Sequence, residues 1–203
     1  MSLSVVILAA GKGTRMFSEQ PKVLHKLAEQ PMLQYVINIA NELKPKNINV
    51  IVGYKAKEVE QTLSHEKVNW ILQKKQLGTG DAVKYAVPNL IGQQTLILYG
   101  DVPLIEINDL KKLIKKGEKG LSILTFNKLN PKGYGRIIRA LNDVEAIVEE
   151  KDCNDTQQRI TEINTGIMVA DTKHLINWLS LISNKNSQKE YYLTDIVALA
   201  KKD

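Results

Sequence analysis

Short apolar runs, rich in β-branched residues, alternate along the chain with stretches in which apolar residues recur at helical spacing. The first run, residues 4–9 (SVVILA), is continuously apolar, as expected of a parallel strand buried on both faces. Further strands are predicted at 47–52, 68–72, 95–99 and 121–126, and helices at 31–43, 55–63, 79–87 and 108–116. This order of strand and helix favours a doubly wound, mostly parallel α/β sheet of Rossmann-like type, with helices on both faces.

The second half of the chain has a different pattern. Strands are predicted at 136–139, 144–149 and 161–169, and two closing helices at 173–181 and 190–200. Because regular crossover helices are missing between these strands, we expect a mixed or antiparallel part of the sheet. No low-complexity linker and no internal repeat interrupts the sequence, and residues 131–135 favour a loop. We therefore expect one domain over residues 1–203.

The position of the basic residues along the chain says more about possible partners than the net charge does. The chain carries a net charge of +6, and its densest basic run is Lys111, Lys112, Lys115, Lys116 and Lys119. No aromatic residue interleaves with these lysines, so a platform for stacking bases is missing. Their spacing indicates the solvated face of a surface helix, and we expect no nucleic-acid partner.

Several other kinds of site and location are disfavoured by the sequence. Cys153 is the only cysteine, which excludes an internal disulfide and a thiolate-rich metal site. His25, His65 and His174 are far apart and lack ligand spacing, so surface or packing roles are expected for them. The first apolar run precedes the first basic residues, the reverse of a signal peptide, and no stretch approaches the roughly 20 apolar residues of a membrane span. We expect a cytoplasmic protein with no membrane contact.

The exit of the first strand is the first candidate ligand site, because open parallel sheets bind ligands beyond the carboxyl ends of their strands. It reads LAAGKGTRM at 8–16, where small residues allow close backbone approach and Arg15, with Lys22 further on, adds positive charge. The dinucleotide fingerprint fails because Met16 stands where a third glycine or alanine is needed, and the Walker pattern fails as well. By itself a tight turn explains this loop about as well as phosphate binding does, but Arg15 and Lys22 favour binding of an anion.

The exit of the strand at 95–99 is the second candidate. Asp101 follows Gly100 there and is placed to meet Mg²⁺ bridging substrate phosphates, since this ion takes only one or two protein carboxylates. An equal alternative is that Asp101 caps the helix that begins near Pro103. No ion-pair partner for Asp101 is evident from the sequence.

Several blocks of the chain together resemble the sugar-phosphate nucleotidyltransferases. The shared blocks are LAAGKGTRM at 8–16, PKVLH at 21–25, Gln73 with QLGTG at 76–80, YGDVPL at 99–104, GYGRI at 133–137, IVE at 147–149, EINTG at 162–166 and YYLTD at 191–195. The first block marks the superfamily. The later ones, in this order, are similar to the N-terminal uridyltransferase domain of bifunctional N-acetylglucosamine-1-phosphate uridyltransferase/glucosamine-1-phosphate acetyltransferases.

The resemblance implies a role for each matching residue. Arg15 and Lys22 would be the catalytic residues, Gln73 would read uracil, and Asp101 would bind Mg²⁺. Gly78 and Thr79 would contact the base, and Gly135, Glu149 and Asn164 would hold the amino sugar. The remaining implied substrate contacts are Leu8, Ala9, Ala10, Gly11, Tyr99 and Gly100. A side-chain amide such as that of Gln73 offers a donor and an acceptor to a base edge.

The implied reaction joins UTP to N-acetylglucosamine 1-phosphate and yields UDP-N-acetylglucosamine and pyrophosphate. A sugar-phosphate oxygen would attack the α-phosphorus directly, with no general base and no covalent enzyme intermediate, so that alignment and charge neutralisation carry catalysis. The product would supply bacterial peptidoglycan, and hence cell-wall, and lipopolysaccharide synthesis.

The match also has limits. The acetyltransferase domain, a β-helix through which the full-length family protein is expected to form homotrimers, has no counterpart here. The family domain extends somewhat beyond the equivalent of Asp203, so we expect a slightly truncated domain without a C-terminal asparagine that helps hold the metal. Alternatives are a relative that uses another sugar or base, and a nucleotide-binding module that has lost turnover.

Overall fold

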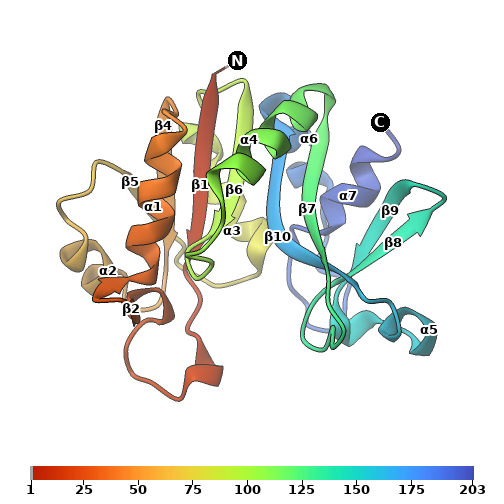
Figure 1. The fold of residues 1–203 in the computed structure, drawn as a ribbon, viewed down its shortest axis with the longest axis horizontal. Helices are drawn as coiled ribbons and strands as arrows, with labels where there is room; N and C mark the ends of the chain where they lie inside the picture. Colours follow the sequence, from red (N-terminus) through yellow and green to blue (C-terminus); the bar gives the residue numbers. More distant parts are fainter. Residues whose placement is uncertain (1) are drawn as a thin grey trace.

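The computed structural model describes residues 2–203, apart from the side chains of Arg15 and Lys119. Its main sheet has eight strands in the order β5–β4–β1–β6–β10–β8–β9, and β7 pairs with β10 (Figure 1). The parallel part consists of β1 (Leu3–Ala9), β4 (Asn47–Val52), β5 (Asn69–Leu72) and β6 (Gln94–Tyr99). This arrangement confirms the predicted doubly wound, mostly parallel α/β sheet.

The second half of the chain adds the antiparallel part. Its strands are β7 (Leu121–Asn127), β8 (Arg136–Ala140), β9 (Asp143–Val148) and β10 (Glu162–Asp171). β10 pairs antiparallel with β6, β7 and β8, and β8 pairs antiparallel with β9. The change of pattern in the sequence therefore marks a real change in strand direction.

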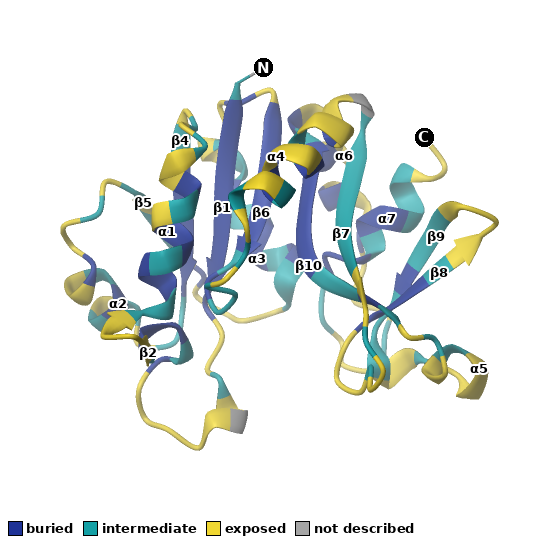
Figure 2. Cartoon of the chain, in the orientation of Figure 1, coloured by how far each residue is buried: buried dark blue, intermediate teal, exposed yellow. Residues whose placement is uncertain are grey.

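Two apolar layers cover the sheet. Alternate residues of β1 point to opposite faces, so Val5 and Ile7 join one core cluster while Val6 and Leu8 join the other. The first cluster includes residues of α1 (Met32–Glu42) and α4 (Ile107–Lys116), and Val59 of α2 (Ala56–Thr62). The second cluster includes residues of α3 (Thr79–Ala86), α6 (Thr172–Leu181) and α7 (Asp195–Ala200). Figure 2 shows the central strands buried and the loops at the strand ends exposed.

Three local features differ from the prediction. The last helix begins at Asp195 rather than at residue 190, because the backbone of Tyr191 instead exchanges hydrogen bonds with Leu77 and Gly80. A small hairpin of β2 (Lys26–Leu27) and β3 (Gln30–Pro31) turns through left-handed residues that are not glycine, and a short helix, α5 (Asp155–Gln158), has an asparagine capping box. Each is too short to give a periodic signal.

The basic helix is as predicted. On α4, Leu110 and Leu113 are buried while the described lysines are exposed: Lys111, Lys112, Lys115 and Lys116. The side chain of Lys119 lies outside the described part. Within residues 2–203, no helix combines the length and the apolar character needed to cross a bilayer.

Candidate active site

A cavity of about 350 Å³ opens at the carboxyl ends of β1 and β6. These strand ends lie at the lower edge of the sheet in Figure 1. Most of the residues predicted to contact substrates line the cavity: Leu8, Ala9, Ala10, Gly11, Lys22, Gln73, Gly78, Thr79, Tyr99 and Asp101. They come from segments far apart in sequence, which the parallel strands bring to one edge. The location expected for a ligand in such a sheet is therefore hollow.

The loop after β1 forms one wall of this cavity. Gly13 has a left-handed backbone (φ 63°), and a Cβ there would lie 2.7 Å from Cβ of Lys22. Glycine thus permits both the turn and the close approach that brings Lys22 to the cavity. The predicted catalytic role of Arg15 falls on a side chain outside the described part.

Lys22 and Asp101 form an ion pair across the cavity, with Nζ of Lys22 bonded to Oδ2 of Asp101. Both side chains are partly exposed, at 34% and 26%. This partner was not evident from the sequence, because the two residues lie 79 positions apart. The capping alternative was wrong, since α4 begins at Ile107 and its N-cap is Glu106. Asp101 is therefore a carboxylate of the cavity wall.

Gln73 is fixed by hydrogen bonds in the cavity wall. It is 2% exposed, and its Nε2 donates to the Gly78 carbonyl at 3.2 Å and to Oδ2 of Asp81 at 2.7 Å. Two acceptors on the same amide nitrogen settle its orientation. The prediction that Gln73 offers both a donor and an acceptor must therefore be corrected, since only its oxygen lacks a hydrogen bond among the described residues.

The entry of α3 is shaped around the segment at 190–194. Gly78 has φ 115°, and a Cβ there would lie 2.5 Å from the Tyr191 carbonyl oxygen. The hydroxyl of Thr79 accepts a hydrogen bond from the Leu193 backbone N–H at 3.0 Å. The same segment brings Glu190 into the cavity lining. This wall is thus built from two segments that hold each other.

The residues predicted to hold the amino sugar form a second cluster beside the cavity. Ile163 of β10, Arg136 of β8 and Val148 of β9 lie in one row of the sheet. Because neighbouring strands in this row run antiparallel, the residue before Arg136 meets the residues after Ile163 and Val148. Those residues are Gly135, Asn164 and Glu149, and register alone brings them together.

Contacts within this cluster agree with the register. The Asn164 backbone N–H donates to the Gly135 carbonyl at 2.9 Å, and a Cβ on Gly135 would lie 3.4 Å from Oε2 of Glu149. Thr194 donates to Oε1 of Glu149 at 3.1 Å. The side-chain oxygen of Asn164 accepts from the Gly166 backbone N–H at 2.9 Å, which leaves its amide nitrogen without a partner among the described residues. A carboxylate oxygen of Glu149, which can accept a hydrogen bond from a hydroxyl, and the amide nitrogen of Asn164, which can donate one, therefore lie close together.

Tyr99 connects the cavity with this cluster. Burial raises its pKa far above the ordinary value, and the carboxylates of Glu149 and Asp101 raise it further, against a hydrogen bond with Thr79. The phenol therefore stays protonated at every ordinary pH. Tyr99 also lines the cavity, and its ring lies against Gly166, whose backbone N–H donates to the Asn164 side chain. Tyr99 therefore lies between the two parts of the site.

Gly100 does not join the cavity lining. Its backbone N–H donates to the Leu8 carbonyl at 2.9 Å, and a Cβ on it would lie 3.1–3.3 Å from side chains of Leu33, Val23 and Ala9. Its position is explained by packing between β1 and the α1 layer.

Several residues of the cavity wall were not predicted as site residues. These are Gly13, Met16, Val23, Gln76, Ala82 and Glu190. All except Ala82 and Glu190 fall inside blocks that carry the family resemblance, so those blocks were the available signal. Glu190 directly precedes such a block.

The donor set can be tested for a magnesium ion. Among the described residues, no three His, Cys, Asp or Glu side chains gather in the manner of a metal cage. Mg²⁺ does not need a cage, since one or two carboxylates together with substrate phosphates and water complete its shell. Asp101 and Glu190 are the carboxylates that line the cavity, and Asp101 fits such a one-carboxylate site.

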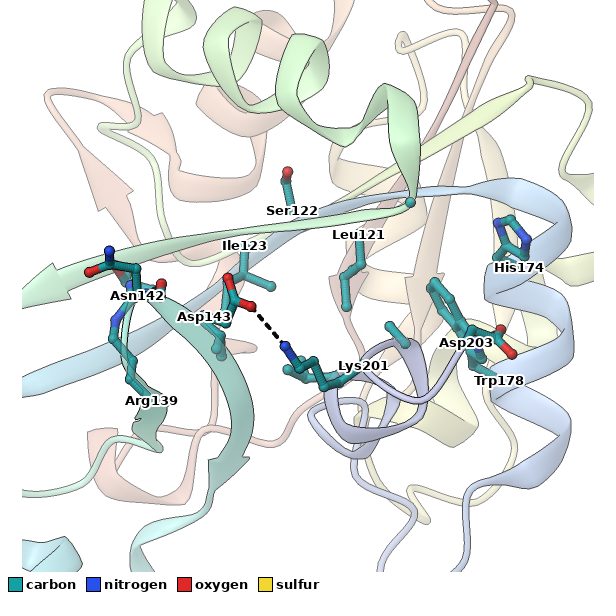
Figure 3. A pocket seen from close by; sticks show the side chains of 15 residues that line it. Leu121, Ser122, Ile123, Arg139, Asn142, Asp143, His174, Trp178, Lys201 and Asp203 are labelled. Carbon is teal, nitrogen blue, oxygen red and sulfur yellow. Dashed lines mark hydrogen bonds and ion pairs between the residues drawn. The ribbon is translucent and has the colours of Figure 1, made fainter.

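A larger cavity, of about 560 Å³, lies elsewhere and contains none of the predicted site residues. Figure 3 shows its charged side chains and the ion pair between Asp143 and Lys201, at 2.8 Å. Asp203 accepts from Trp178 Nε1 at 2.7 Å, and Arg139 is paired with Glu162 at 2.7 Å. Because no residue that lines the larger cavity lies at the carboxyl end of a parallel strand, the smaller cavity is the better candidate for chemistry.

Glu149 gives a testable signature of the site. Burial raises the pKa of its carboxyl, a hydrogen bond from Thr194 opposes this, and Asp152, Asp195 and Glu190 add to the increase. The unfolded chain then loses this proton at lower pH than the folded one, so stability falls as pH rises through the window above the ordinary value. Glu149→Gln cannot ionise, and we expect it to melt at or above the parent's temperature at neutral pH.

Thermal melts from about pH 4 to 8 would check this prediction. The difference in melting temperature between Glu149→Gln and the parent should become more positive as pH rises. The inference that burial raises the pKa of Glu149 would be contradicted if the variant melted at a lower temperature than the parent at neutral pH and the difference did not become more positive as pH rises.

Known structures share this fold. UDP-glucose pyrophosphorylase complexed with UDP-glucose matches with a TM-score of 0.79 and 18% identity, over 100% of this chain and 88% of that chain. A Bacillus anthracis protein assigned as a glucose-1-phosphate thymidylyltransferase, in complex with sucrose, has a TM-score of 0.79 and 18% identity, over 99% and 83%. HddC from Yersinia pseudotuberculosis complexed with GMP-PN has 0.68 and 20%, over 94% and 83%.

At these identities the structural likeness establishes the fold, which is that of sugar nucleotidyltransferases. Sequence establishes the family. Residues 5–147 match the domain described as MobA-like NTP transferase, and this span includes β1 with its loop, Lys22, Gln73 and Asp101. The chain therefore belongs to the family of MobA-like NTP transferase domains, whose members are nucleotidyltransferases.

Proposed function

We propose that this nucleotidyltransferase joins UTP to N-acetylglucosamine 1-phosphate, with release of pyrophosphate and formation of UDP-N-acetylglucosamine. The observation that carries the proposal is the fixed amide of Gln73, in the same cavity as Lys22 and Asp101. Its nitrogen is held by Asp81 and Gly78, so its oxygen is left to accept a hydrogen bond from a ligand. Uracil carries a ring N–H that can donate to this oxygen, whereas the corresponding ring nitrogen of cytosine is an acceptor.

Lys22 and Asp101 would handle the triphosphate. The ammonium of Lys22 would neutralise phosphate charge, as would Arg15 by the family resemblance, while Asp101 would hold Mg²⁺. When bound, such an ion supplies charge neutralisation at the leaving pyrophosphate. The attacking sugar phosphate is already an anion, so no side chain has to remove a proton. These residues act by alignment and electrostatic stabilisation.

The cluster of Gly135, Glu149 and Asn164 would hold the amino sugar. Oε2 of Glu149 can accept from a sugar hydroxyl, and the amide nitrogen of Asn164 can donate to a hydroxyl or to the acetamido carbonyl. Gly135 leaves space next to Oε2, which a side chain would fill. Tyr99 stands between this cluster and the cavity, where the two substrates would meet.

The sugar specificity of the proposal has a direct test. N-acetylglucosamine 1-phosphate should be used about tenfold or more better, in kcat/KM, than glucosamine 1-phosphate or glucose 1-phosphate, because sugars without the acetamido carbonyl leave the amide of Asn164 unmatched. Parallel assays of pyrophosphate release with the three sugars and UTP would measure this.

The same assays address the second candidate. The structural neighbour that was solved with UDP-glucose favours glucose 1-phosphate as the competing substrate. If the protein prefers glucose 1-phosphate, the proposed sugar substrate is wrong, and the assignment as a nucleotidyltransferase still holds. If the proposal holds, the product would feed peptidoglycan and lipopolysaccharide synthesis.

A further inference from the structure

Arg136 is a buried arginine next to the candidate sugar cluster. It is 2% exposed and lies directly after Gly135, in the row of the sheet between Ile163 and Val148. Arg136 does not contribute to the lining of the 350 Å³ cavity. Neither the family blocks nor the register explains why a full charge is buried at this position.

The hydrogen bonds of Arg136 all point to the loop before it and to segments around that loop. Nη1 donates to the Tyr134 carbonyl and to Oε2 of Glu150, the latter at 3.1 Å, and Nη2 lies 3.5 Å from the Gln158 carbonyl. The same Oε2 of Glu150 accepts from the Gly133 backbone N–H. One arginine and one glutamate therefore hold both Gly133 and Tyr134.

Glu150 is suited to stay ionised in this arrangement. Burial pushes the pKa of its carboxyl upward, but the hydrogen bonds from Gly133 and Arg136 outweigh this and hold the pKa below its ordinary value. A buried guanidinium needs such a charged partner. The pair also lies one residue from the cluster on each side, since Gly135 precedes Arg136 and Glu149 precedes Glu150.

We propose that Arg136 and Glu150 form a clamp that positions the loop at 133–135 to receive the sugar phosphate. The inference rests on the proposed function, because it assigns the clamp to the sugar half of that site. Arg136 touches no substrate and is a positioning residue. Its planar guanidinium serves the Tyr134 carbonyl and Glu150 through Nη1 while Nη2 faces the Gln158 carbonyl, and a lysine, with one nitrogen at a different reach, cannot serve all three.

The chain offers a matched control on the same strand. Arg139 also pairs with a glutamate, through two hydrogen bonds of 2.7 Å to Glu162, and it donates to the Asn142 carbonyl. Arg139→Lys therefore removes a forked ion pair from β8 without touching the loop at 133–135. Any effect shared by Arg136→Lys and Arg139→Lys reflects loss of a strand ion pair, whereas a difference reports on the clamp.

Steady-state kinetics of the parent, Arg136→Lys and Arg139→Lys provide the test, with UTP, Mg²⁺ and N-acetylglucosamine 1-phosphate. For Arg136→Lys we expect the KM for the sugar phosphate to rise about tenfold or more while the KM for UTP stays within about twofold. Arg139→Lys should leave both within about twofold. Glu150→Gln, which keeps the acceptor for Gly133 but loses the charge, should shift the same KM as Arg136→Lys.

Other outcomes overturn the clamp. The clamp is overturned if Arg136→Lys changes the two KM values no more than Arg139→Lys does. It is also overturned if Arg136→Lys raises the KM for the sugar phosphate and the KM for UTP equally. Failure of both Arg136→Lys and Glu150→Gln to fold, judged by thermal melts, would make the pair structural only.

An inactive parent would instead count against the proposed function. Amide hydrogen exchange then decides the clamp without any substrate. Faster exchange at 133–135 in Arg136→Lys than in Arg139→Lys supports it, and equal exchange overturns it.

Discussion

Asp101→Asn should lower turnover by about a hundredfold or more while leaving the melting temperature nearly unchanged. Removing one preorganised electrostatic partner of a transferring group typically costs a factor of this size. The ion pair with Lys22 is partly exposed, and pairs of that kind contribute only about 0–1 kcal/mol to stability. Asparagine keeps the shape of the side chain but cannot offer a negative charge to Mg²⁺.

The measurement is kcat at several Mg²⁺ concentrations, with parallel thermal melts. Asp109→Asn is the matched control, because Asp109 also pairs with a lysine, Lys112 at 3.2 Å, but lies on the exposed helix α4. Binding of UTP without metal should be retained in Asp101→Asn, since Lys22 is released from its partner. Turnover equal to that of the parent would place the metal elsewhere.

Discrimination between UTP and CTP should be the second large effect. The parent should use UTP about ten- to a hundredfold better in kcat/KM, because a mismatched polar contact in a desolvated pocket costs about 1–3 kcal/mol. Cytosine would set an acceptor against the fixed oxygen of Gln73. In Gln73→Met, which removes the amide at similar volume, the ratio should fall toward one.

The control for this prediction is Gln76→Met. Gln76 also lines the cavity, but its amide nitrogen bonds to the Gln73 backbone carbonyl at 3.2 Å. Its replacement should leave the ratio of UTP to CTP unchanged. Equal use of the two nucleotides by the parent, or an unchanged ratio in Gln73→Met, would contradict the assignment of Gln73 to the base.

The fold was largely predictable because its signals are local. The run at 4–9 is apolar throughout since β1 is buried on both faces, and α1 shows helical spacing since only one face meets the core. The segment at 190–194 escaped prediction because its conformation depends on hydrogen bonds from Tyr191 to residues of a distant loop and helix. The local pattern of apolar and polar residues cannot reveal hydrogen-bond partners that are distant in sequence.

The location of the cavity was predictable, but the bonds within its wall were not. Strand exits indicated where the cavity lies, and the resemblance supplied Glu149 and Asn164 as candidates. Lys22 forms an ion pair with Asp101, and Gln73 donates a hydrogen bond to Asp81. Both interactions depend on side-chain geometry, which the pattern of apolar and polar residues does not specify. Register, which only the folded sheet reveals, explains why the sugar cluster assembles.

Pyrophosphate release from UTP and N-acetylglucosamine 1-phosphate, measured with and without Mg²⁺, is the decisive experiment for the proposed activity. We expect stoichiometric release of pyrophosphate with formation of UDP-N-acetylglucosamine, dependent on both substrates and abolished by removing the metal. Absence of product from the pure protein at saturating substrates and Mg²⁺, while UTP still binds, would contradict it and favour a nucleotide-binding module without turnover.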